Sequence, residues 1–95
     1  MRLPPRFDMT ITRADFRRLL PAAVNNAPFT EQEDAFVHEN GVRSWRIGFV
    51  PLPQLRIGLI RLERHRVDFK FAGYSAEEIA DFMARFEAYF RRGGG

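Results

Sequence analysis

Hydrophobic positions between Phe36 and Phe90 follow two different periods. Over residues 42–50, 56–62 and 66–72 they alternate with polar positions, and this predicts half-buried strands because successive side chains of a strand point to opposite faces of its sheet. Further along, apolar residues recur at spacings of three and four, which predicts an amphipathic helix. Its apolar stripe consists of Ile79, Phe82, Met83, Phe86, Tyr89 and Phe90. The stretch therefore predicts antiparallel strands followed by one helix.

A strand and a short helix are predicted ahead of this stretch. Residues 7–11 alternate between apolar and polar side chains, which is typical of a half-buried strand. Thr12 offers an N-cap for a helix with Asp15 at its third position. We expect the helix to end or kink near Leu20, because the ring of Pro21 would clash with the carbonyl group four residues earlier.

Two structures are compatible with residues 31–39, which follow a predicted loop at residues 21–29. Thr30 and Glu33 could form a capping box at the start of a helix. Asn40-Gly41 instead predicts a tight hairpin, because a type I′ turn needs positive φ at both central residues. We favour the hairpin. A two-residue turn would set Phe36 opposite Trp45 and would place four apolar side chains on one side of the sheet, namely Phe36, Trp45, Ile47 and Phe49.

A second hairpin is predicted after residues 51–54, where Pro51 and Pro53 interrupt the strand pattern. Residues 56–62 and 66–72 would pair across a tight turn at Arg64-His65. In this register Ile60 lies opposite Phe69, Gly58 lies opposite Phe71, and Arg61 lies opposite Asp68 on the other face.

The strongest local signal is the start of the last helix. Ser75 is predicted to be its N-cap, and Glu78 completes a capping box. We expect the helix to pack on the aromatic face of the sheet. The prediction is a single α+β domain over residues 1–95, in the order β-α-β-β-β-β-α, with a flexible N-terminal arm at residues 1–5 and a flexible glycine tail at residues 93–95.

Composition supports one small core. The chain has 95 residues, of which 45% are hydrophobic and ten are phenylalanine, which is enough for one core but not two. It contains no cysteine, so disulfides and thiolate chemistry are excluded. We find neither the apolar run of a signal peptide nor a segment of roughly 18 apolar residues that would span a membrane. We therefore expect a soluble, cytoplasmic protein without a membrane partner.

The residues needed for catalysis are not gathered in any motif. His38 and His65 do not occur at a metal-binding spacing, and we expect both to be surface or structural residues. Neither Ser44 nor Ser75 belongs to a nucleophile motif, and no glycine-rich phosphate loop is present. We therefore expect a non-enzymatic protein without catalytic residues, cofactor or metal.

Arginine dominates the positive charge, with fourteen arginines and one lysine against twelve carboxylates. An anion or a nucleic acid could bind along the strands, because guanidinium groups bind phosphate bidentately and stack on bases. The candidate contacts are Arg43, Arg46, Arg56, Arg61, Arg64, Arg66 and Lys70. The element order resembles that of double-stranded-RNA-binding modules, which implies binding through a basic start of the last helix. Here the matching stretch is Ala76-Glu77-Glu78, which would repel phosphate.

The second face of the sheet is the preferred candidate for function. Branched aliphatic residues lie on it among arginines, and Gly48 would permit close approach of another surface. We expect a homodimer or another protein to contact this face, because a two-fold interface uses one patch twice. The candidate contacts are Val37, Val42, Arg46, Val50, Ile57 and Leu59. The alternative is that the N-terminal strand and helix cover the face.

Overall fold

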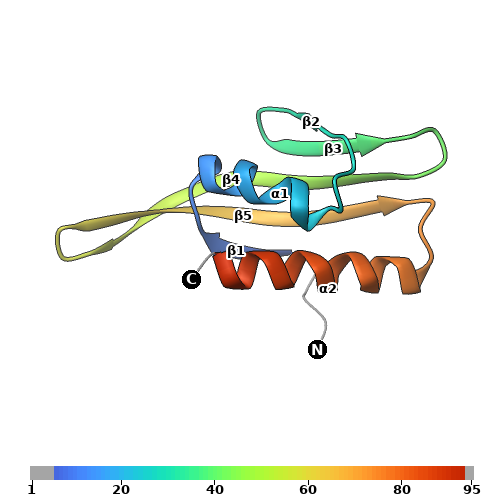
Figure 1. Ribbon diagram of the computed structural model, residues 1–95. Helices are drawn as coiled ribbons and strands as arrows, with labels where there is room; N and C mark the ends of the chain where they lie inside the picture. Colours follow the sequence, from blue (N-terminus) through green and yellow to red (C-terminus); the bar gives the residue numbers. More distant parts are fainter. Residues whose placement is uncertain (1–5, 94–95) are drawn as a thin grey trace.

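The protein folds into one antiparallel sheet with two helices on the same side of it (Figure 1). The computed structural model describes residues 6–93, so the predictions for residues 1–5 and for the last two glycines lie outside the described residues. The strand order in the sheet is β1-β5-β4-β3-β2, and every neighbouring pair is antiparallel. The elements are β1 (Arg6–Thr10), α1 (Arg13–Ala23), β2 (Thr30–Glu31), β3 (Ala35–Glu39), β4 (Ser44–Ile57), β5 (Ile60–Ala72) and α2 (Ala76–Gly93).

The predicted fold class is confirmed, including the packing of the C-terminal helix on the aromatic face. Phe82 of α2 lies with its ring centroid 5.0 Å from that of Phe71, and Phe86 lies 4.9 Å from Phe69. Helix α1 covers the other half of the same face, where Phe16 contacts Phe49 at 4.3 Å. Because Phe16 also packs 4.8 Å from Phe90 of α2, the two helices and the sheet share one aromatic core.

Both helices begin where the sequence predicts. The Thr12 hydroxyl accepts a hydrogen bond from the Asp15 N–H at 3.0 Å. At α2 the capping box is complete, because the Glu78 N–H donates to the Ser75 hydroxyl and the Ser75 N–H donates to the Glu78 carboxylate. Two of the four N–H groups that a helix start leaves unpaired are thereby satisfied at low cost. Helix α2 extends to Gly93, the first residue of the predicted glycine tail.

Of the two outcomes predicted near Leu20, an end or a kink of α1, the end is wrong, because the helix continues through Pro21 to Ala23. Proline removes one hydrogen bond within a helix, the bond to the carbonyl of Arg17. Both of these residues lie on the exposed side of α1, so water can hydrate that carbonyl. The inward side continues without interruption and ends with a hydrogen bond from the Val24 N–H to the Leu20 carbonyl at 3.0 Å.

The first hairpin forms, but its predicted register is wrong by two residues. Phe36 lies opposite Ile47 rather than Trp45, and Trp45 lies opposite His38. The turn is centred on Gly41 and Val42, with φ of +90° at Gly41, and the Asn40 side chain accepts hydrogen bonds from the N–H groups that follow it. A shift of two residues leaves every side chain on its predicted face, because the period of a strand is two.

The second hairpin differs more from the prediction, because β4 continues through the two prolines to Ile57 and the turn lies at Gly58-Leu59. Strand β3 pairs with β4 only as far as Gly48, so from Val50 onward β4 has a free edge on which proline removes no ladder hydrogen bond. A bulge between Leu52 and Leu55 absorbs the remaining irregularity. The predicted partners of Gly58 and Arg61 are therefore wrong, since Arg61 lies opposite Arg56.

Candidate association surface

One face of the sheet carries no helix, and we call it the outer face. Packing of α1 and α2 covers the side that holds Trp45, Ile47 and Phe49. The alternative that N-terminal elements cover the outer face is therefore wrong, because β1 joins the sheet edge beside β5 and α1 joins the aromatic core. Strand alternation from these buried positions assigns to the outer face Val37, Arg46, Val50, Leu52, Arg64, Arg66, Asp68 and Lys70.

Beyond the bulge, β4 and β5 leave the body of the protein as a two-stranded ribbon, which we call the hairpin arm and define as residues 55–62. Figure 1 shows it extending past both helices, at the left of the view. Its apolar side chains are exposed to an unusual degree: Leu59 is 102% exposed, Ile60 59%, Ile57 58% and Leu55 39%. Four large aliphatic side chains of one short segment therefore lie in water together.

The six residues predicted to contact a protein do not form a single patch. Val37 and Arg46 are cross-strand neighbours, and Val50 follows them along β4 on the outer face. Ile57 and Leu59 belong to the hairpin arm. Val42 lies in the turn at the opposite end of β4, where it is 82% exposed.

The sequence suggested that Gly48 would permit close approach of another surface, but the structure leaves no room for one at this position. A Cβ atom at Gly48 would lie 1.8 Å from the Asp68 carboxylate, which covers this position from the neighbouring strand. Gly48 is consequently buried although it lies on the outer face. Its role is to accommodate Asp68.

Sequence reasoning missed the exposed Leu55 and Ile60, because it placed the hairpin turn at Arg64-His65. The glycine in Ile57-Gly58-Leu59 was the available signal for a turn at this point of the chain. In the structure Gly58 does lie in the turn, with φ of +59°. With the turn at this glycine, the alternation of residues 55–62 separates an aliphatic side from a basic side.

Most of the basic residues predicted to contact an anion already form ion pairs. Arg64 and Arg66 both bind Asp8, at 3.3 and 3.1 Å, so β1 neutralises part of the outer face. The other pairs are Arg43 with Glu78 at 2.6 Å and Arg46 with Asp34 at 3.6 Å. The remaining three candidates, Arg56, Arg61 and Lys70, form no ion pair with any carboxylate among residues 6–93.

Both histidines are structural, and neither lies on the surface. His65 is 5% exposed, its Nδ1 lies 2.9 Å from the Ile11 carbonyl oxygen, and its ring stacks on Phe49 at 4.0 Å. His38 is 7% exposed, with Nδ1 2.6 Å from the Pro28 carbonyl oxygen. Each ring joins a strand of the sheet to a segment distant in sequence, and its hydrogen bond offsets the cost of burying a polar group.

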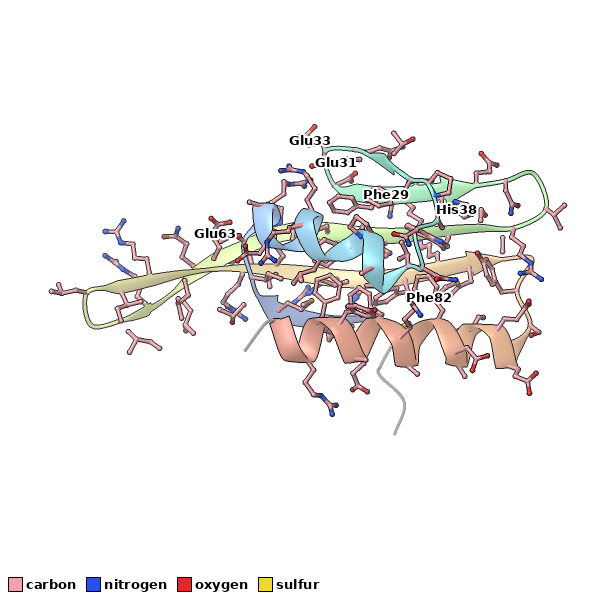
Figure 2. All side chains as sticks on the ribbon, viewed as in Figure 1. Phe29, Glu31, Glu33, His38, Glu63 and Phe82 are labelled. Atoms are coloured by element: carbon pink, nitrogen blue, oxygen red, sulfur yellow. The ribbon has the colours of Figure 1, made fainter. Side chains whose placement is uncertain are left out.

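Among the described residues, Glu31 is the centre of a charge cluster with Arg13 and Arg17. Its carboxylate accepts hydrogen bonds from Arg17 at 2.6 and 2.8 Å and from Arg13 at 2.9 Å. These bonds, from Arg17 above all, lower the pKa of Glu31 to about 2, and burial opposes them only in part. The cluster fastens the short edge strand β2 to α1; Figure 2 shows Glu31 at this edge, away from the hairpin arm.

Two concave regions lie on the helix side of the sheet. A cleft of about 420 Å³ is lined by residues that include Arg43, Trp45, Tyr74, Glu78 and Phe82. Arg43 lies over the Tyr74 ring at 5.4 Å, and burial raises the pKa of the Tyr74 hydroxyl.

The second region is a groove of about 260 Å³ between the edge strand β1 and α2, lined by Phe7, Met9, Phe86, Glu87, Phe90 and Arg91. Within residues 6–93, no three carboxylates or histidines gather as a metal site would require. In the same part of the chain, neither helix is long and apolar enough to cross a membrane.

Comparison of the chain with protein-family models, with curated proteins and with solved structures gives no match in any of the three.

Proposed function

We propose that this protein is a non-enzymatic association module, which self-associates or binds a partner protein through the outer face of its sheet and the hairpin arm. The observation that supports this most strongly is the exposure of Leu55, Ile57, Leu59 and Ile60 on one short ribbon. Exposed apolar clusters of this size usually mark contact sites, because leaving them in water forgoes the free energy of burial.

The architecture supports the same function. Both helices are used to cover the aromatic face, so the fold has no described element left for the outer face. A two-stranded ribbon is marginally stable at best when isolated in water, and the hairpin arm therefore benefits from any surface that covers its apolar side.

Analytical ultracentrifugation tests the proposal. We expect the purified chain to sediment as an oligomer at micromolar concentrations and to dissociate on dilution. Val50→Asp should weaken the association, whereas Val42→Asp, which adds the same charge at a more exposed valine in the distant turn, should not. A strict monomer at high micromolar concentration would remove the self-association version.

The version with a different partner has its own test. A photo-crosslinking residue at position 50 should yield one defined adduct in cells, and the same residue at position 42 should not. Identical adducts from both positions, together with a monomeric chain, would contradict the proposal.

A nucleic acid is the second candidate, favoured by one observation. Arg56 and Arg61 lie directly opposite each other on the hairpin arm without a carboxylate partner among the described residues, and such like-charge pairs are destabilising unless an anion lies between them. Binding of labelled RNA or DNA should then fall steeply with salt. Arg56→Gln with Arg61→Gln should weaken it more than Arg18→Gln on α1. No binding at low salt would refute this candidate.

A further inference from the structure

The hairpin arm is amphipathic across its width. Leu55 pairs with Leu62, and Ile57 pairs with Ile60, and paired residues of an antiparallel ladder point to the same side. Arg56 pairs with Arg61 on the reverse side. The arm therefore has one aliphatic side and one basic side.

The aliphatic side continues into the body of the sheet as a stripe without charge. Alternation along β5 places Leu62 and Ile60 on the same side as Arg64, and β4 adds Leu52 opposite Arg64 and Val50 one step further. The first charges met are Arg64 and Arg66, and both are already bound to Asp8. We call the residues Val50, Leu52, Leu55, Ile57, Ile60 and Leu62 the aliphatic stripe.

We propose that a second copy of this chain covers the stripe, with the two hairpin arms packed face to face and antiparallel across a two-fold axis. This inference rests on the proposed function and names its partner. The Ile57 and Ile60 pair near the tip of one arm packs over the partner's Leu52 and the partner's Val50, while Leu55 and Leu62 lie near the axis. The result is two small packed sheets, in which Arg56 and Arg61 stay in solvent on the outside.

Three properties of the aliphatic stripe indicate that a second copy of the chain, rather than another partner, covers it. It carries no charge, so a nucleic acid or a strongly charged protein would gain nothing from it and would desolvate its own polar groups. An antiparallel two-fold contact sets the aliphatic tip of one arm against Leu52 and Val50 at the base of the other, where the neighbouring arginines are neutralised by Asp8. The exposed fractions of Val50, Leu55, Ile57, Leu59 and Ile60 correspond to roughly 500 Å² per chain, so two copies would bury about 1,000 Å², the least that a specific interface needs.

The test combines sedimentation with crosslinking, for which the absence of native cysteine is an advantage. Ile57→Asp should raise the dimer dissociation constant by about a hundredfold or more, because two carboxylates become buried without partners. Val42→Asp is the matched control and should change it by less than about twofold. Circular dichroism should show both variants folded, since both side chains are largely exposed in one chain.

Crosslinking reports the geometry directly. With a short bis-maleimide reagent, Leu55→Cys should form a covalent dimer at concentrations at which Val42→Cys remains monomeric. A dimer that survives Ile57→Asp and shows no preference for position 55 would overturn the inference but leave self-association through the rest of the outer face. A monomeric wild-type chain would overturn both, and binding of that monomer to anionic phospholipid vesicles through Leu59 would assign the arm to a membrane surface.

Discussion

Gly73 connects β5 to α2 at a point where the chain touches the first hairpin. Its φ is +79°, and a Cβ atom at this position would lie 2.2 Å from the Val42 carbonyl oxygen and 3.2 Å from the Arg43 Cα. Both neighbours are backbone atoms, so neither can rotate away as a flexible side chain would. Gly73→Ala should therefore be strongly destabilising.

The magnitude has two parts. Positive φ costs a non-glycine residue about 1 kcal/mol, and separating two backbone segments that are in contact costs about 1 to 3 kcal/mol more. We expect a loss of about 3 kcal/mol in the free energy of unfolding, from a total of roughly 5 to 14 kcal/mol for a chain of this length. The melting temperature should fall by about 12 to 24 °C.

A substitution at Gly58 measures the cost of positive φ without the cost of the steric contact. Gly58 has φ of +59°, but nothing lies within 4 Å of the position of its Cβ, so Gly58→Ala should cost only the backbone term, about 1 kcal/mol. Asparagine tolerates positive φ better than alanine does. Gly58→Asn should therefore be nearly neutral, whereas Gly73→Asn should remain costly because the steric contact persists.

Urea unfolding followed by fluorescence is a suitable assay, because Trp45 is the only tryptophan and is 2% exposed. All variants should be compared at one protein concentration, since self-association would add to the apparent stability. If Gly73→Ala and Gly58→Ala differ by less than about 0.5 kcal/mol, the contact between the β5–α2 connection and the first hairpin does not constrain the fold, and the reasoning fails.

Three further predictions concern the caps, the charge cluster and the core. Ser75→Ala should cost about 1 kcal/mol in urea unfolding, because α2 loses its N-cap hydrogen bond; no loss would show that the capping box is redundant. Glu31→Gln should destabilise the protein near pH 7 by about 1 kcal/mol or less. Because the folded pKa of Glu31 is lowered from 4.5 to about 2, its stabilisation is present above pH 4.5 and is lost as pH falls toward 2, so the wild-type and Glu31→Gln unfolding free energies should converge over that range. A constant difference from pH 7 to pH 2 would contradict this assignment. Phe16→Ala should cost about 3 to 5 kcal/mol, because Phe16 is fully buried between the sheet and α2; a loss below about 1 kcal/mol in the same unfolding assay would show that the core relaxes into the space.

Local signals in the sequence predicted the elements whose causes are local. The capping box at Ser75 and Glu78 and the N-cap at Thr12 depend on contacts three residues apart, and both are present. The assignment of side chains to faces also follows from the sequence, because alternation has a period of two and survives a register shift of two residues. The aromatic face and its helix could therefore be predicted although the pairing of Phe36 was wrong.

Tertiary structure decided which turn closes the second hairpin, and with it the shape of the candidate surface. His65 was predicted to lie in a turn, but its ring stacks on Phe49 and contacts the Ile11 carbonyl, and these partners lie far away in sequence. Pro51 was predicted to break a strand, yet the end of β3 leaves β4 with a free edge that tolerates it. Alternation by itself determined that one face of the sheet is aromatic and the other mixed. Only the packing of distant segments decided that the hairpin arm extends past the helices, because a chain cannot show locally which of its edges will be paired.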